Sequence, residues 1–291
     1  MRLTQRFSFN VICLATVLLA TRSGLGQTTV AWTQATNGVS IAVDPANNVF
    51  TVYYDANLGG DITLTKRDVN GNFLWQSSFD QTDSTKWERA EWVATDSQGN
   101  AIVCGTVMSG FSNPVVAASV AMKFSPSGAL LWRNVYDGPF DGSSTKRCVV
   151  DAQDEIYVLG LGMGPAGLVT RVRKFSSTGA TIWNYFDTDG IGAPQNIKIA
   201  PDQNLLIVGR FITGSFNGYL KITPSGTRVW GLSGIASPSA GDLSGDAFGN
   251  TSLVHGQFPT SPTTCAVKKL DPTGSQIFST SYPLGGTRIE V

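Results

Sequence analysis

Short apolar runs alternate with clusters of turn-forming residues along most of the chain. Segments such as TDSQGNAIVCG and VDAQDEIYVLG place Asp, Asn or Gly directly before a run of apolar and β-branched residues. Three others share this arrangement: VDPANNVFTVYY, IAPDQNLLIVG and GDAFGNTSLVHG. A polar turn cluster that leads into a short apolar run predicts a strand, a tight turn and a second strand. No sustained 3.6-residue periodicity occurs beyond the N-terminal segment, so the pattern predicts an all-β protein.

A second phrase recurs five times, once after each of these segments. It has a lysine, a glycine five residues later and an aromatic residue nine residues after the lysine. The phrases are KRDVNGNFLW (66–75), KFSPSGALLW (123–132), KFSSTGATIW (174–183), KITPSGTRVW (221–230) and KLDPTGSQIF (269–278). The glycine can adopt the positive φ that a tight turn between strands requires. Each repeat is therefore predicted to contain four short antiparallel strands.

The spacing of the repeats predicts a β-propeller. The aromatic position recurs every 43 to 57 residues when Trp32 is counted as the first. Four strands at that period are expected of propeller blades, which bury their faces against neighbouring blades. VAWTQ, before the first repeat, matches a fourth strand, and the final TRIEV matches a first strand. We predict five full repeats plus terminal strands of an incomplete sixth, although five blades that close with spare strands, or a piece of a longer six- or seven-bladed protein, also fit.

The turn phrases resemble a known repeat family. DSQGNAIVCGT and QFPTSPTTCAVKKLDPTGSQIFSTSYPLGG are similar to the bacterial β-propeller repeat called SBBP, and the resemblance covers residues 28–291. It implies a propeller fold in an exported or cell-surface protein of bacterial type, and it carries no catalytic residues. A weaker similarity exists to quinoprotein-like propeller repeats, whose glycine turn also leads to a docking tryptophan. Those enzymes usually need eight blades and a cofactor pocket, which the sequence does not show.

The N-terminus has the layout of a secretory signal peptide. Arg2 and Arg6 precede an apolar run, Phe7–Ala20, and small residues follow up to Gly26. We predict a signal peptide over residues 1–26, a propeller domain over 27–291, and a secreted, periplasmic or cell-surface location. No later segment approaches the roughly 20 apolar residues that a membrane helix needs, so no membrane span is predicted.

Charge and composition narrow the class of partner. The 21 basic and 21 acidic residues cancel, and charged residues make up only 14% of the chain. Nucleic acid is therefore not an expected partner, because binding it needs a basic field. Single aspartates stand in the turns, where they are expected to cap backbone amides: Asp44, Asp96, Asp151, Asp246 and Asp271. No run has the ligand spacing of a calcium loop, the nearest being DAQDE (151–155) and DTDG (187–190), so we predict neither a metal nor a cofactor.

The cysteines and the single histidine offer little catalytic chemistry. Cys104, Cys148 and Cys265 remain after signal removal, and they are either buried free thiols or one disulfide with a leftover thiol. His255 aligns with Val52 and its equivalents in the middle of a second strand, which predicts a packing residue. No GxSxG elbow accompanies it, so no catalytic residue is assigned.

The first strand of each blade should line a central channel. Alternate residues of these strands, among them Ile41, Val93, Cys148, Ile197 and Leu243, are predicted to lie between blades. Six other side chains should cluster at the channel mouth: Ser40, Trp92, Arg147, Asn196, Asp242 and Arg288. Such a set could bind a sugar or a carboxylate, or its members could simply hydrogen-bond one another. The connections that vary in length emerge on this side of the disc, where binding sites are commonly built.

A second candidate contact lies in the segment DSTKWERAEW. Lys86, Trp87 and Arg89 are predicted to lie in a loop before the second blade, where an indole between two cations could stack on a carbohydrate. Cation–π pairing within the loop and ordinary packing over the blade edge are the alternatives.

These features predict a non-enzymatic scaffold that binds a protein or glycan partner through its variable loops. The first alternative is a propeller-fold lyase or glycoside hydrolase acting at the channel mouth with Asp242, Arg147 and Glu91. The second is a fragment of a larger surface protein without a separate activity.

Overall fold

The computed structural model of the chain is built of strands and the turns between them. It describes residues 13–16, 32–36, 38–55, 61–79, 86–109, 117–136, 144–164, 167–188, 191–210, 216–236, 241–256 and 265–282. Within these ranges no residue is helical, as the sequence pattern predicts. Accordingly, no helix in this part of the chain is long and apolar enough to cross a membrane.

Five antiparallel four-stranded sheets follow one another along the chain. Sheet 1 contains β3 (Ser40–Val43), β4 (Val49–Asp55), β5 (Asp61–Arg67) and β6 (Phe73–Phe79). Sheet 2 contains β7 (Lys86–Thr95), β8 (Ala101–Ser109), β9 (Ala117–Phe124) and β10 (Leu130–Tyr136). Sheet 3 contains β11 (Thr145–Val150), β12 (Ile156–Gly164), β13 (Gly167–Phe175) and β14 (Thr181–Phe186).

The last two sheets repeat this order, so within each sheet every strand pairs with the next one along the chain. Sheet 4 contains β15 (Ala193–Ile199), β16 (Leu205–Arg210), β17 (Phe216–Ile222) and β18 (Arg228–Ala236). Sheet 5 contains β19 (Asp242–Gly245), β20 (Thr251–Gly256), β21 (Cys265–Leu270) and β22 (Gln276–Tyr282). A separate two-stranded ladder joins β1 (Cys13–Thr16) to β2 (Thr33–Thr36), so part of the segment expected to be a signal peptide pairs with a strand beyond it.

The turns explain why the sheets form where the sequence predicts them. The connections between first and second strands and between third and fourth strands all have five residues, as in Asp44–Asn48 and Asp68–Asn72. In every one the backbone of the first residue bonds to that of the fifth, and the fourth residue bonds back to the first. The fourth residue has positive φ, for example 90° at Gly128 and 63° at Asn47. Glycine and asparagine tolerate this conformation better than most residues do.

The predicted role of the turn aspartates is confirmed. In sheet 1, Asp44 Oδ1 accepts hydrogen bonds from the backbone N–H groups of Ala46 and Asn48 at 3.0 and 2.8 Å. The corresponding aspartates of the other turns accept equivalent bonds: Asp96, Asp151, Asp246 and Asp271. These side chains are therefore part of the scaffold.

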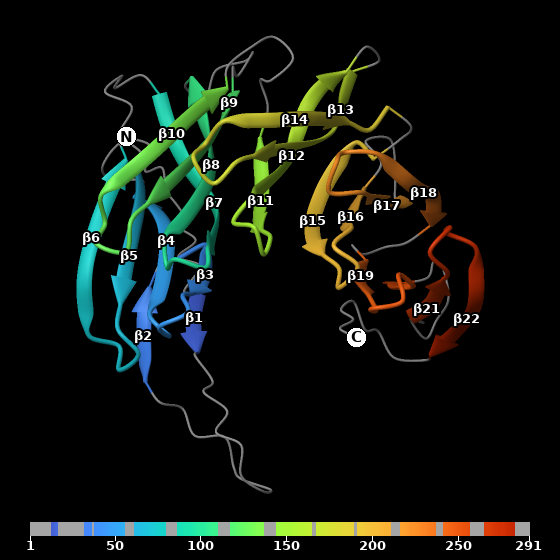
Figure 1. Cartoon of the computed structure of the whole chain (residues 1–291), viewed down its shortest axis with the longest axis horizontal. Coiled ribbons are helices and arrows are strands. Elements are labelled where there is room, and N and C mark those ends of the chain that lie inside the picture. Colours follow the sequence, from blue (N-terminus) through green and yellow to red (C-terminus); the bar gives the residue numbers. More distant parts are fainter. Residues whose placement is uncertain are drawn as a thin grey trace, which may run out of the picture.

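The sheets are arranged around an arc, in chain order from sheet 1 to sheet 5 (Figure 1). The first strands β3, β7, β11, β15 and β19 face the inside of the arc, while β6 and β22 lie on its outside (Figure 1). Contacts join β3 to β7, β7 to β11, β11 to β15 and β16 to β19. Each of the four junctions between consecutive sheets buries an apolar cluster, and removal of this surface from water is the main stabilising term.

First-strand side chains fill these junctions in four of the five sheets. Val93, Cys148, Ile197 and Leu243 are at most 1% exposed, as the strand alternation predicts. Ile41, their equivalent in sheet 1, is 40% exposed, so its prediction as an interface residue is wrong for the described structure. The reason is that no described four-stranded sheet precedes sheet 1: only the two-stranded ladder of β1 and β2 comes before it, and Ile41 stays exposed.

In sheets 1 to 4 the repeat lysine is a buried structural cation. Lys123 Nζ lies 2.8 Å from Asp96 Oδ2 in the turn of its own sheet, and neither side chain is more than 7% exposed. It also donates a hydrogen bond of 3.0 Å to the backbone oxygen of Ser177 in sheet 3. The lysine therefore fixes one turn within a sheet and a second turn in the next sheet, which accounts for its recurrence without any role in chemistry.

Candidate ligand-binding site

Four successive sheets each place one predicted site residue on the inside of the arc, and these four side chains form a continuous chain of contacts. The guanidinium carbon of Arg147 lies 3.5 Å from the centroid of the Trp92 ring. Arg147 Nη1 donates a hydrogen bond to Asn196 Oδ1. Asn196 Nδ2 in turn donates to Asp242 Oδ1 at 3.3 Å. Lys198 Nζ completes the set, 2.9 Å from Asp242 Oδ2. We call these five residues the channel cluster.

The strand register explains why the cluster assembles. Trp92, Arg147, Asn196 and Asp242 each stand opposite a buried residue of their second strand: Cys104, Leu159, Val208 and Val254, respectively. In β7, β11 and β15 the ladder skips the residue just before the cluster member. A skipped residue of this kind marks a β-bulge, which re-aims nearby side chains. The skipped residues are Glu91, Lys146 and Gln195.

Glu91, which precedes Trp92 in β7, is a carboxyl whose pKa the surrounding structure shifts. Burial raises its pKa, while the nearby charges of Arg89 and Lys146 oppose the shift. Its Oε1 lies 2.8 Å from Arg89 Nε. Burial, the larger effect, favours the protonated form of this carboxyl, whereas the two cations favour the carboxylate.

Ser40 and Arg288 are not brought into the cluster by the described structure. Ser40 is 8% exposed, and its Oγ accepts a hydrogen bond of 3.2 Å from the backbone N–H of Val93. It therefore ties sheet 1 to sheet 2. Arg288 lies outside the described residues, as do residues 287–291, which were expected to form a first strand.

Lys86, Trp87 and Arg89 belong to a strand, which corrects their prediction as loop residues. β7 begins at Lys86, and Trp87 pairs with Met108 while Arg89 pairs with Thr106. The strand extends toward the N-terminus because β8 continues to Ser109, which pairs with Lys86. Trp87 is half-buried, and Arg89 is exposed and bound to Glu91. As part of a binding surface, these three residues remain a prediction.

Sequence reasoning missed Lys146, whose charge acts on Glu91, and Lys198, which binds Asp242. Lys198 lies two residues after Asn196, hence on the same face of β15, and this spacing was the available signal. Lys146 was hidden because strict alternation assigns it to the opposite face from Arg147. The bulges that alter this assignment depend on backbone pairing, and no residue type in the sequence marks them.

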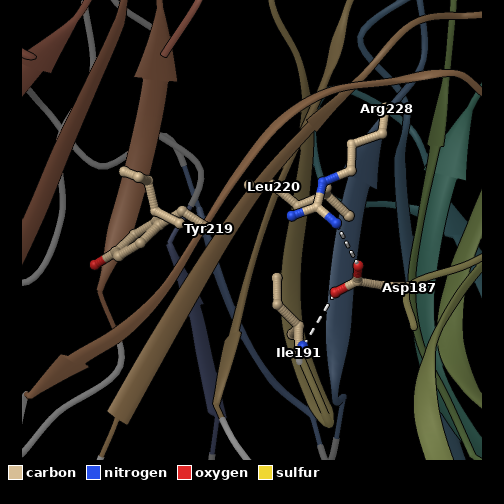
Figure 2. Close-up of a pocket in the computed structure, with 7 residues that line it drawn as sticks. Asp187, Ile191, Tyr219, Leu220 and Arg228 are labelled. Carbon is tan, nitrogen blue, oxygen red and sulfur yellow. Dashed lines mark hydrogen bonds and ion pairs between the residues drawn. The ribbon is translucent and has the colours of Figure 1, made fainter. Parts of the chain in front are cut away.

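A small hollow lies between the β14–β15 connection and sheet 4, lined by Asp187, Ile191, Tyr219, Leu220, Arg228, Gly231 and Leu232. Figure 2 shows the carboxylate of Asp187 between Arg228 and the backbone of Ile191. Asp187 Oδ2 accepts a hydrogen bond of 3.0 Å from Ile191 N, and Oδ1 lies 3.7 Å from Arg228 Nη1. The volume open to the centre of a water molecule is about 10 Å³. The hollow therefore has room for about one water molecule and is too small for a sugar. Asp187 therefore fixes the connection.

His255 and the cysteines are buried in the sheets. The register pairs Asp242 with Val254, so Val254 and not His255 is the equivalent of Val52, and the predicted alignment is one residue out. His255 is nevertheless 4% exposed within β20, in keeping with a packing role. Cys104, Cys148 and Cys265 are free and buried. Burial, followed by the neighbouring Cys148, raises the pKa of Cys104, which makes this thiol a poor nucleophile. Among the described residues no three potential ligands come together as a metal site.

Comparisons with known proteins bear on the fold. No protein-family model matches the chain, and no curated protein matches it. A protein of unknown function from Bacteroides caccae matches with 11% identity and a TM-score of 0.51, over 87% of this chain and 86% of its own. One from Dyadobacter fermentans matches with 8% identity and a TM-score of 0.53, over 86% and 84%. An ulvan lyase of a polysaccharide lyase family matches with 9% identity and a TM-score of 0.46, over 86% and 66%.

At these identities the likeness concerns the fold alone. The two matches with TM-scores above 0.5 support a β-propeller type of fold for the five sheets. The resemblance to the SBBP repeat rests on the turn phrases and is not shown by any family match.

Proposed function

We propose that the protein is a secreted or cell-surface β-propeller that binds a glycan or protein partner at the mouth of its central channel, without catalysing a reaction. The observation that carries the proposal is the contact chain from Trp92 through Arg147 and Asn196 to Asp242. Four sheets contribute to this one cluster, which is the arrangement expected when a ring of blades builds a central site.

The cluster combines the chemistry that sugars and carboxylates require. Trp92 and Arg147 are half-buried, so an indole and a guanidinium are within reach of a ligand while their apolar parts are packed. Asn196 and Asp242 add an amide and a carboxylate for hydroxyl groups. A ligand hydroxyl or carboxylate would replace Asn196 Oδ1 as the acceptor of the hydrogen bond from Arg147. Arginine suits carboxylates because its N–H groups form a planar fork.

The connections on one side of the sheets supply the variation that specificity needs. The turns on the opposite side all have five residues, whereas connections such as 165–166, 187–192 and 137–144 range from two to eight residues. First strands run from the variable connection toward the constant turn. Asp242 is the first residue of β19 and Arg147 the third of β11, so these two cluster residues lie toward the variable side. Variable connections on a fixed scaffold are a common origin of binding surfaces.

Trp32 supports the proposal that the ring has an incomplete sixth blade. Its Nε1 donates a hydrogen bond of 2.9 Å to the backbone oxygen of Val69, and its ring packs on Gly71. Trp75 makes the same contacts with Pro126 and Gly128 in the next sheet. On this proposal, Trp32 and the strand β2 after it take the place of a fourth strand ahead of sheet 1. The signal peptide over residues 1–26 is removed, and the propeller domain spans residues 27–291.

A glycan-array and pull-down screen with the exported chain tests the proposal. We expect a glycan or protein that binds the wild type and binds Trp92→Ala at least about tenfold more weakly. Binding is measured well below the melting temperature of the variant, because Trp92 also packs against the apolar cluster between sheets 2 and 3. The matched control is Ile182→Ala, which removes an exposed apolar side chain from the outside of sheet 3 and should leave binding unchanged. Equal binding by Trp92→Ala and wild type would refute a channel site.

The raised pKa of Glu91 favours a second candidate, a lyase or glycoside hydrolase that uses this carboxyl as a proton donor. Asp242, its expected partner, is engaged by Lys198 and Asn196. The test is product release from any glycan identified on the array. Loss of product formation in Glu91→Gln with binding retained would establish catalysis, and binding without turnover by the wild type supports the scaffold.

A further inference from the structure

Every junction between consecutive sheets uses the same contact, in which an aromatic side chain of one fourth strand covers the glycine turn of the next sheet. The covered glycines have φ between 83° and 90°, and a Cβ placed on any of them would lie 2.7 to 3.0 Å from the covering ring. The pairs are Trp32 with Gly71, Trp75 with Gly128, Trp132 with Gly179, Trp183 with Gly226 and Trp230 with Gly274.

Hydrogen bonds accompany this contact at the turns of sheets 2, 3 and 4. At sheet 5, Trp230 Nε1 has no hydrogen-bond partner among the described residues, and Lys221 Nζ donates instead to Gly249 O at 2.7 Å. The backbone oxygen of Pro126 accepts both Trp75 Nε1 at 2.9 Å and Lys66 Nζ at 3.3 Å from the preceding sheet. The backbone oxygens of Ser177 and Pro224 each accept the same two donors. Two residues after the tryptophan, Ser77 Oγ donates to Gly128 O at 2.8 Å. The turn is thus recognised by an aromatic ring, an ammonium group and a short polar side chain.

Sheet 5 presents the same set of groups without a turn against them in the described structure. We call Lys269, Phe278, Thr280 and Tyr282 the sheet 5 face. Phe278 is 46% exposed, whereas Trp230 at the same repeat position is 7% exposed. The side chain of Lys269 is 30% exposed, against 2–8% for the other four repeat lysines. Tyr282 is 54% exposed, while its equivalent Phe79 is 5% exposed.

Every turn of this type within the 291 residues already has an aromatic partner. The phrase with lysine, glycine and aromatic residue occurs five times in the 291 residues, so the sequence supplies five such turns. All five are covered by an aromatic side chain of this same chain. A second copy offers no uncovered turn either, because Trp32 occupies the turn of its sheet 1.

We propose that the sheet 5 face binds the glycine turn of a further β-sheet of the same repeat type, beyond the five sheets described above. Phe278 covers the glycine, Lys269 binds the carbonyl oxygen two residues before it, and Thr280 binds the carbonyl of the glycine itself. The face continues an interface that the chain already forms between its own sheets. Its preferred ligand is a turn of the form Ser/Thr-Pro-Ser-Gly, as in residues 125–128 and 223–226, because these turns are bound in that manner within the chain.

The probe is a backbone-cyclised hairpin with the sequence of residues 217–232, labelled with a fluorophore and checked for turn formation by nuclear magnetic resonance. Its affinity for the full exported chain is measured by fluorescence anisotropy. We expect binding that is lost in Phe278→Asp and strengthened roughly 3- to 10-fold in Phe278→Trp, since an indole adds contact area and an N–H donor. Melting temperatures of both variants should match that of wild type, because Phe278 is exposed.

The matched control is the same cyclic hairpin with Gly226→Val, whose turn cannot adopt the positive φ without strain. It should bind at least tenfold more weakly than the glycine hairpin. A hairpin with a photoreactive group beside the turn should cross-link to residues 269–282.

Several results would overturn the proposal. They are equal binding of the valine hairpin, unchanged binding by Phe278→Asp, cross-links outside sheet 5, and absence of binding by both wild type and Phe278→Trp. If the chain forms a dimer and Phe278→Asp dissociates it, a second copy of the chain covers the sheet 5 face, and the proposal is wrong. Channel-site binding is unaffected by any of these outcomes, because the sheet 5 face shares no residue with the channel cluster.

Discussion

The guanidinium group of Arg147 lies over the indole ring of Trp92, 3.5 Å from its centroid, although the two residues belong to different sheets. Sheet 2 supplies the ring and sheet 3 the cation. Both side chains are half-buried, so water can replace either partner when the other is removed. The contact therefore contributes little to the free energy of unfolding, and its geometry matters chiefly for what the channel mouth can bind.

The first prediction concerns Arg147→Lys. The substitution retains the charge but replaces the planar fork by a point charge that cannot cover the ring and bind Asn196 in the same way. We expect the free energy of unfolding to change by less than about 1 kcal/mol. Affinity for the ligand found by the array should fall about tenfold, which corresponds to about 1.4 kcal/mol.

Urea unfolding and a binding titration on the same samples measure both effects. Arg133→Lys is a suitable control, because Arg133 lies on the fourth strand of sheet 2 and contacts Phe79 away from the channel. A change in stability with intact affinity in Arg147→Lys would show that the cluster only joins the sheets.

The second prediction compares two equivalent aromatic residues. Trp183 packs on Gly226, and its Nε1 donates a hydrogen bond of 3.1 Å to Pro224 O. Phe278 holds the same repeat position in sheet 5 but is 46% exposed. Trp183→Ala should lower the free energy of unfolding by about 3–5 kcal/mol, and Phe278→Ala by less than about 1 kcal/mol.

Chemical unfolding of both variants in the absence of any partner provides the comparison. Costs that differ by less than about 1 kcal/mol would contradict the assignment of Trp183 as a junction residue.

The contrast between these two residues shows what the sequence can and cannot predict. The four-stranded sheets were predictable because each turn has a local cause: a capping side chain such as Asp44 and a residue of positive φ such as Gly128. The exposure of Ile41 and Phe278 was not, because it depends on which sheets have neighbours. A repeat pattern predicts which residues each sheet can bury. It does not predict what packs against the outer faces of the first and last sheets.

The candidate site was predictable to a similar extent. Strand alternation brought Trp92, Arg147 and Asn196 to one face, and the structure links them in that order. It missed Lys146, because a β-bulge depends on the pairing between two strands. Sequence periodicity assumes an uninterrupted ladder, and side chains beside a bulge violate that assumption.

The third prediction uses two glycines with positive φ. Gly128 has φ of 90°, and a Cβ there would lie 2.9 Å from Cδ2 of Trp75. Gly167 has φ of 119°, and a Cβ there would meet nothing within 4 Å. Gly167→Ala should therefore cost about 1–3 kcal/mol of backbone strain alone. Gly128→Ala should cost a further 1–3 kcal/mol or so, because the indole must move.

Thermal and urea unfolding of the two alanine variants measure the difference. Indole fluorescence should also change in Gly128→Ala and remain that of wild type in Gly167→Ala. If the two variants cost the same, the ring does not rest on the glycine and the junction has to be reinterpreted.

The fourth prediction concerns acid stability. Hydrogen bonds, first from Asn250 and then from Lys269, lower the pKa of Asp246 to about 2 despite some desolvation. A hydrogen bond from Thr273 is the largest cause of the lowered pKa of Asp271, and one from Asn72 has that role at Asp68. A carboxyl whose folded pKa is depressed stabilises the protein above its unfolded pKa of about 3.9, and this stabilisation is lost as pH falls through the folded pKa. The free energy of unfolding should therefore decline between about pH 4 and pH 2.

One turn of the chain is capped by a hydroxyl group, which does not titrate in this pH range. At the position of Asp68 and Asp271, the turn of sheet 4 has Thr223, whose Oγ1 accepts a hydrogen bond of 3.0 Å from Thr227 N. Asp271→Thr combined with Asp68→Ser should keep both turns capped and remove their two titrations. Urea unfolding at pH 6 and pH 3 should show a smaller loss of stability for this variant than for wild type, because fewer protons are taken up on unfolding. An unchanged loss would mean that these two carboxyls do not govern the acid response, and that buried pairs such as Asp96 with Lys123 do.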